Sequence, residues 1–136
     1  MTYDTDIIEA ARQTITDFEI LIANPEAVLD EWKDYDQFGG IALCKTILER
    51  HNTTAPNCRE CPLQTGKRRL DVGPHGACAA PGHGLQSYAA LSWLIYQWHD
   101  GKQTAAHVAK ISYAATKRME LLKRRLEKNL GSGVVL

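Results

Sequence analysis

Residues 44 to 84 of this chain read CKTILERHNTTAPNCRECPLQTGKRRLDVGPHGACAAPGHG. They include all four cysteines, four of the five prolines and three of the five histidines. Beyond residue 51 this segment has no sustained apolar repeat of the kind that predicts a helix or a strand. A segment of this length needs another source of order, and a bound metal ion would supply it.

The cysteines have the spacing of metal ligands. Cys58 and Cys61 form a C-x2-C pair, which lets one tight turn direct two thiolates at a single ion. His75 and Cys78 repeat this spacing after thirteen intervening residues, close to the two-pair layout of zinc fingers and ribbons. Cys44 lies on an expected helix before the pair. The sequence therefore predicts a metal site drawn from these five residues.

Two ligand sets are compatible with this spacing. One uses the four cysteines, and the other replaces Cys44 or Cys78 with a histidine, taken from His51, His75 or His83. Zinc accepts both sets, whereas a [4Fe–4S] cluster favours four thiolates. We expect zinc as the cofactor and keep the cluster as the alternative. A third reading treats the cysteines as small buried side chains that bind no metal.

Five positions resemble the outline of the WhiB-like family of iron–sulfur regulators: Cys44, Cys58, Cys61, Pro62 and Cys78. Those proteins are small and helical, with an early cysteine on a helix, a C-x2-C-P and a fourth cysteine. In that family the last cysteine follows the pair more closely, and a glycine–tryptophan turn and a characteristic basic tail motif follow the cluster. This chain has neither, so the resemblance implies only the iron–sulfur alternative and not membership.

Length and composition indicate one globular domain. The chain has 136 residues, of which 44% are hydrophobic and 24% charged, and we expect a single helical domain over residues 1–136 with a metal-binding insert at 44–84. The first residues do not have the pattern of a secretory signal, and the longest apolar run is too short to cross a bilayer. We therefore expect a cytoplasmic protein with no membrane contact, in which clustered cysteines indicate metal rather than disulfides.

The expected fold class is all-α: about five helices around a long, metal-stapled, Gly/Pro-rich loop of residues 52–84. Apolar steps of three and four residues predict helices over about 5–23, 25–34, 41–51, 85–100 and 104–130. Asp4 or Thr5 and then Thr104 suit the first and last helix starts, and Gly131 suits the last helix end. In the last helix the apolar steps are nearly heptad, which predicts packing within the chain or a homodimer.

Charge is segregated along the chain. Residues 1–43 hold ten acids and two bases, a net charge of −8, and residues 102–136 hold eight bases and two acids, a net charge of +6. The basic residues predicted to contact nucleic acid are Lys67, Arg68, Arg69, Lys117, Arg118, Arg124, Arg125 and Lys128. Such contact would be with the phosphate backbone, because residues 117–128 include no Asn, Gln or Ser to read base edges. The alternatives are solvated surface charges on the last helix, and a basic protein partner for the acidic first helices.

Enzyme motifs are absent from the sequence. It contains no H-x-E with P-C-x-x-C, no H-E-x-x-H, no G-x-S-x-G and no phosphate-binding loop. We therefore expect a small zinc-binding regulatory or adaptor protein that acts through nucleic-acid or protein binding. An iron–sulfur sensor is the alternative, and a metal-dependent hydrolase using His51 or His83 is a further one. Trp93, Tyr96 and Trp98 are expected to be core or interface anchors.

Overall fold

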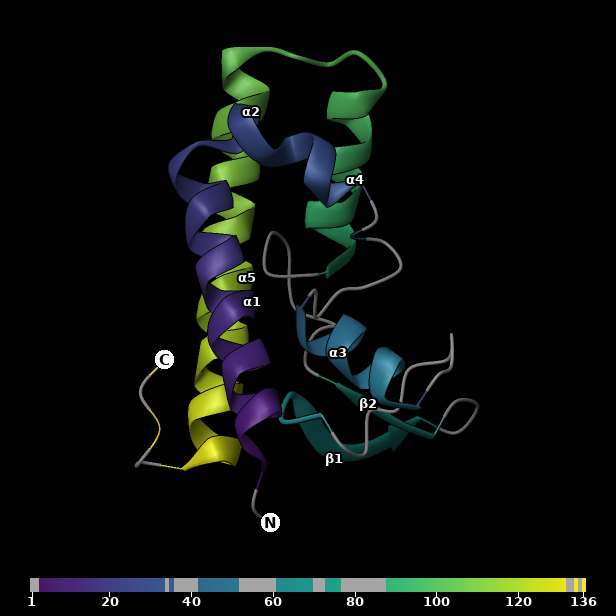
Figure 1. The fold of residues 1–136 in the computed structure, drawn as a ribbon. Coiled ribbons are helices and arrows are strands. Elements are labelled where there is room, and N and C mark those ends of the chain that lie inside the picture. The colour runs from purple at the N-terminus through teal and green to yellow at the C-terminus, as the bar shows by residue number, and fades with distance from the viewer. Residues whose placement is uncertain are drawn as a thin grey trace.

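The computed structural model describes residues 3–33, 35, 42–51, 61–69, 73–76, 88–131, 134 and 136. For His51, Tyr88 and the two strands it describes the backbone alone. The described part is mostly helical, with two long helices, α1 (Thr5–Ala23) and α5 (Ala105–Leu130), side by side and antiparallel (Figure 1). The expected helical class is confirmed, and the residues that the structure describes form five α-helices.

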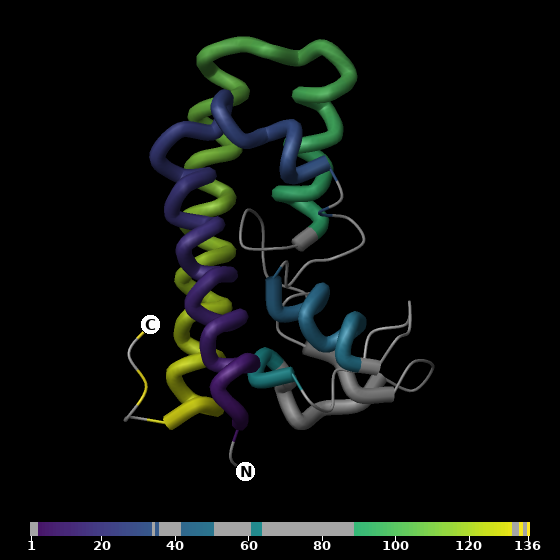
Figure 2. Tube along the Cα trace, viewed as in Figure 1, coloured from purple at the N-terminus to yellow at the C-terminus, as the bar shows by residue number. Residues whose placement is uncertain are grey.

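The shorter elements lie along one side of the α1–α5 pair (Figure 2). Helix α2 (Pro25–Val28) and the 3-10 helix η1 (Leu29–Trp32) cross from the end of α1 toward α4 (Tyr88–His99). Helix α3 (Ala42–His51) packs against α1, and α4 packs against α5. The helix expected over residues 25–34 is thus two short helical pieces.

The segment expected to be a loop contains a two-stranded antiparallel sheet. Strand β1 (Gln64–Arg69) pairs with β2 (Gly73–Gly76), with Gln64 opposite Gly76 and Arg69 opposite Gly73. The register shifts between Gln64 and Arg68. These strands were not predicted, because QTGKRR and GPHG lack the alternating apolar pattern that predicts a strand.

The ends of the two long helices coincide with capping residues. The carboxylate of Asp4 accepts a hydrogen bond from the Ile7 amide at 3.0 Å, which caps α1. The hydroxyl of Thr104 accepts one from the His107 amide at 3.1 Å, which caps α5. At the other end of α5, Gly131 has a φ of 90°, a left-handed conformation that favours glycine.

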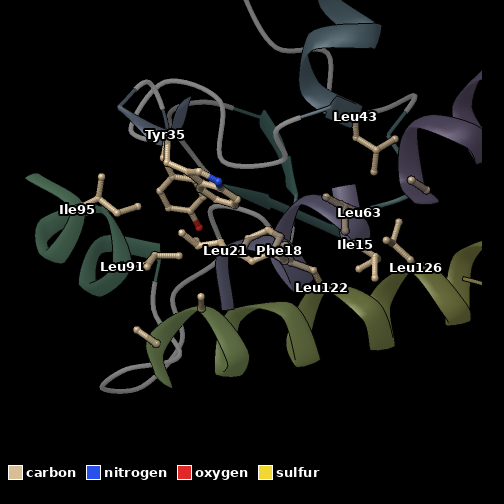
Figure 3. Close-up of a cluster of buried hydrophobic side chains, with 14 of the residues drawn as sticks. Ile15, Phe18, Leu21, Tyr35, Leu43, Leu63, Leu91, Ile95, Leu122 and Leu126 are labelled. Carbon is tan, nitrogen blue, oxygen red and sulfur yellow. The ribbon is translucent and has the colours of Figure 1, made fainter. Parts of the chain in front are cut away.

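One apolar core joins the helices (Figure 3). Its buried members on α1 and α5 include Ile7, Ala11, Ile15, Phe18, Leu21, Ile111, Ala115, Leu122 and Leu126. The near-heptad stripe of α5 is therefore used inside the chain, and a homodimer would need another surface. No helix in the described part of the chain is long and apolar enough to cross a membrane.

A buried hydroxyl fixes α3 on α1. The Thr14 Oγ1 atom donates to the carbonyl oxygen of Ala10 at 2.9 Å and accepts from the amide of Leu43 at 3.1 Å. Leu43 is the second residue of α3, where an amide has no partner within its own helix. The Thr14 side chain on α1 thus caps α3 and helps to position Cys44, the residue after Leu43.

A surface contact adds a second tie between the same helices. The guanidinium of Arg50 on α3 lies 2.9 Å from the carboxylate of Asp4 and also donates a hydrogen bond to it. This hydrogen bond, followed by the one from the Ile7 amide, lowers the pKa of Asp4 below its ordinary range.

Candidate functional site

Cys61 is the candidate ligand that the structure defines best. It is buried, as are Pro62 and Leu63 after it, and the Leu63 amide donates a hydrogen bond to its Sγ atom at 3.4 Å. Amide hydrogen bonds to sulfur are a feature of thiolate metal centres, where they orient the ligand and tune the metal. The local geometry at Cys61 therefore suits a metal-bound thiolate.

The turn that carries Cys61 is anchored to the core and to α5. Leu63 is fully buried in the same cluster as Ile15 and Leu126 (Figure 3). The side-chain amide of Asn129 donates to the carbonyl oxygen of Pro62 at 2.6 Å. Because both contacts are to the long helices, the position of the sulfur is set by the helical framework.

Cys44 lies on α3 and is half-buried. Leu43 and Ile47 of the same helix belong to the core cluster that also contains Cys61 and Leu63. Helix α3 and the Cys61 turn thus meet on one apolar core, at the end of the molecule where β1 and β2 lie (Figure 1).

The other candidate ligands lie outside what the structure describes. Cys58, Cys78 and His83 are not among the described residues, and only the backbones of His75 and His51 are described, in β2 and at the end of α3. Within the described part, no group of three or more His, Cys, Asp or Glu side chains could hold a metal ion. The ligand set predicted from the sequence therefore remains a prediction.

The predicted nucleic-acid contacts fall into two groups. Lys67, Arg68 and Arg69 lie in β1, where the backbone alone is described. On α5, Arg124 and Lys128 are exposed, and Lys117 and Arg125 are half-buried. Lys117 lies 3.9 Å from Glu120 of its own helix and 5.4 Å from the ring centre of Tyr113.

Arg118, predicted to contact nucleic acid, does not lie on the exposed face of α5. Its side chain is fully buried. The reason is helical periodicity: Arg118 follows Ile111 by seven residues and precedes Leu122 by four, so all three share the face that packs on the core. A guanidinium there cannot lie along a phosphate backbone.

A groove of about 750 Å³ opens at the other end of the molecule, between η1 and α4. Trp32, Tyr35 and Ile95 line it and are themselves buried, so they form its floor. Trp32 also packs edge-on against Phe18, with ring centres 5.0 Å apart, which fixes the floor to α1.

The α4 side of this groove is aromatic and open to solvent. Trp93 and Tyr96 line the groove and are each 58% exposed, with ring centres 5.5 Å apart and an interplanar angle of 17°. Trp93 and Tyr96 are therefore not core residues of this chain, whereas Trp98 packs against the core.

Polar groups also line the groove. Lys33, Ser92 and His99 lie along it. His99 Nε2 donates to the carbonyl oxygen of Leu29 at 2.9 Å, which ties the end of α4 to η1. The Nδ1 atom of the same ring is 3.9 Å from the carboxylate of Asp30, whose side chain is 99% exposed.

Sequence reasoning missed this groove. Trp93 and Tyr96 are three residues apart and Ala89 is four before Trp93, so one face of α4 carries all three. The sequence shows that these residues share one face of the helix. It does not show whether that face is buried in the chain or exposed to solvent.

Comparison with protein-family models, curated proteins and solved structures found no match.

Proposed function

We propose that this chain is a small metal-binding regulatory or adaptor protein with a structural zinc ion. Cys58, Cys61 and Cys78 bind the ion, and Cys44 or His75 completes the site. Four protein ligands leave no open coordination position for water, so the ion stabilises the fold rather than performing catalysis. It holds residues 52–84 against the helices, and its binding free energy is part of the folding free energy.

The observation that carries this proposal is the environment of Cys61. Its sulfur accepts an amide hydrogen bond, and its turn is fixed by Leu63 in the core and by Asn129 of α5. A thiolate held in this way by a helical framework is preorganised for a metal, and it is half of a C-x2-C pair. The approach of α3 to the same core supports Cys44 as a further ligand.

The regulatory role rests on surfaces. Exposed bases on α5, among them Arg124 and Lys128, support contact with a nucleic-acid backbone. The open aromatic groove between η1 and α4 supports contact with a protein.

Metal content tests the proposal. Protein purified without added metal is expected to contain about one zinc ion per chain by elemental mass spectrometry. Cys61→Ser is expected to lose the metal and to melt at a lower temperature. Cys61→His is expected to keep part of the zinc, because imidazole replaces thiolate at zinc more readily than at a [4Fe–4S] cluster.

Leu63→Val is the matched control, because it changes the same turn without removing a ligand and should keep the metal. A brown protein with about four irons per chain would support the iron–sulfur alternative. A metal-free wild type that melts at the same temperature as Cys61→Ser would refute the proposal.

A further inference from the structure

The groove between η1 and α4 combines an apolar floor with an open aromatic wall. Its volume of about 750 Å³ is in the range that holds a small ligand or a few side chains of a peptide. Trp32, Tyr35 and Ile95 offer apolar contact at the floor. Trp93 and Tyr96 stack nearly parallel and remain more than half exposed, so aromatic surface is left for a planar group to cover.

The charged side chains near the groove favour a planar group that carries a positive charge. Asp30 is 3.9 Å from His99, which lines the groove, so a fully solvated carboxylate lies at the rim. Glu31 and Asp100, the neighbours of Asp30 and His99 in sequence, are also exposed. Among the described residues that line the groove, Lys33 is the one lysine or arginine, and Lys102 is an exposed base two residues after Asp100. Carboxylates here repel phosphate and attract a cation, so this rim fits a basic partner better than a nucleic acid.

An arginine side chain fits both the exposed aromatic surface and the carboxylates beside the groove. Its guanidinium is planar and stacks on aromatic faces, it is always charged, and it pairs with carboxylates through two parallel hydrogen bonds. An apolar side chain next to this arginine in the partner would contact the apolar floor of the groove.

We propose that this groove binds an arginine-bearing segment of a partner protein. One guanidinium stacks on Trp93 and Tyr96 and pairs with Asp30, while a neighbouring apolar side chain contacts Trp32 and the floor. This inference names the partner of the adaptor role and in that respect rests on the proposed function. It uses none of the candidate metal ligands.

A binding experiment tests the groove directly. The probe is a fluorescently labelled peptide of repeated Arg-Gly-Leu triplets, titrated with the full chain and followed by anisotropy. Its comparison probe carries citrulline, which keeps the shape of arginine without its charge. We expect saturable binding of the arginine peptide and about tenfold weaker binding of the citrulline peptide.

Variants locate the binding on the protein. Trp93→Ala is expected to weaken the arginine peptide about fivefold, and Asp30→Asn about twofold. Tyr113→Ala is the matched control, because this tyrosine on α5 is 53% exposed and does not line the groove; it should bind as the wild type does. Trp93 is more than half exposed, so its removal should leave the melting temperature unchanged.

Several results would overturn the inference. They are equal binding of the arginine and citrulline peptides, wild-type affinity in Trp93→Ala, and no saturable binding up to about 1 mM protein. Binding of single-stranded oligothymidine that depends on Trp93 would also overturn it, in favour of a nucleic-acid site.

The same samples separate this inference from the metal proposal. If wild-type protein contains no metal as purified, and still binds the peptide more tightly than Trp93→Ala does, the metal proposal alone is contradicted. Metal-loaded wild-type protein that does not bind it would contradict the groove inference alone.

Discussion

Thr14 illustrates how much a single buried oxygen can position. Its Oγ1 atom is the partner of the Leu43 amide, at the start of the helix that carries Cys44. Without this oxygen, a backbone amide would be buried with no acceptor in its own helix. The cap therefore links α1 directly to the placement of a candidate ligand.

Thr14→Val should destabilise the fold by about 1–3 kcal/mol, because the valine keeps the shape and leaves the Leu43 amide without its acceptor. Chemical denaturation measures this change, and hydrogen exchange at the Leu43 amide should accelerate. Thr16→Val, an exposed threonine on the same helix, is the control and should change stability by less than about 0.5 kcal/mol. Equal effects of the two substitutions would show that the hydroxyl has no capping role.

The contact between Arg50 and Asp4 predicts a pH dependence. The pKa of Asp4 is lowered in the folded protein, first by the hydrogen bond from Arg50 and then by that from Ile7. A carboxylate with a lowered folded pKa stabilises the fold above its unfolded pKa, near 4, and this contribution is lost as the pH falls through the folded pKa.

Arg50→Gln should therefore raise the pKa of Asp4 toward its ordinary value, as measured by NMR titration of its carboxyl carbon. The stability difference between wild type and variant should be present at neutral pH and shrink on acidification below about pH 4. Arg12→Gln, whose guanidinium pairs with Glu9 instead, should leave the Asp4 titration unchanged. An unaltered Asp4 pKa in Arg50→Gln would contradict the contact.

At the level of whole elements, α5 has two distinct faces. One face, with Ile111, Leu122 and Leu126, packs on the core and includes Arg118. The other carries exposed bases such as Arg124 and Lys128. Of the two faces of α5, the second is the one open to a nucleic acid, so the contribution of α5 to the salt dependence of binding should come from it.

The double variant Arg124→Gln, Lys128→Gln tests this face of α5. If both bases contact phosphates of duplex DNA, the slope of log affinity against log salt should shrink by about 1.8, or about 0.9 for each charge. The measurement is a filter-binding or anisotropy titration at several salt concentrations, with Arg12→Gln on α1 as the control. An unchanged slope, or no binding by the wild type at low salt, would contradict the predicted contact.

How far the sequence predicts each element depends on how local its causes are. The ends of α5 at Thr104 and Gly131 follow from local caps and are confirmed. Of the two residues predicted to cap α1, Asp4 and Thr5, the structure shows Asp4 as the cap. The pairing of β1 with β2 depends on backbone hydrogen bonds, and no apolar pattern in these segments predicts it. An element with local causes could be predicted, and one without them could not.

The sites follow the same division. The spacing of Cys58 and Cys61 is readable in one line of sequence, whereas the anchoring of Cys61 depends on Asn129, sixty-seven residues from its partner Pro62. The burial of Arg118 depends on which face of α5 meets α1. The groove likewise exists only because η1 and α4, distant in sequence, lie side by side.

In the molecule as a whole, the two candidate sites lie at opposite ends of the α1–α5 pair. The turn of Cys61 lies at the end where β1 and β2 lie, and the groove lies where η1 meets α4 (Figure 1). The acidic α1 and the basic α5 run side by side between them, so the segregated charges of the sequence are adjacent in space. A metal at one end can therefore stabilise the fold without occupying the surface that meets a partner.

X-ray absorption spectroscopy of protein purified without added metal shows whether this chain holds a thiolate-bound zinc ion, because it identifies the element and its ligands together. We expect a zinc edge and four coordinating atoms, mostly sulfur at about 2.3 Å. A sample without bound metal, or coordination by nitrogen and oxygen with no sulfur, would contradict the zinc proposal.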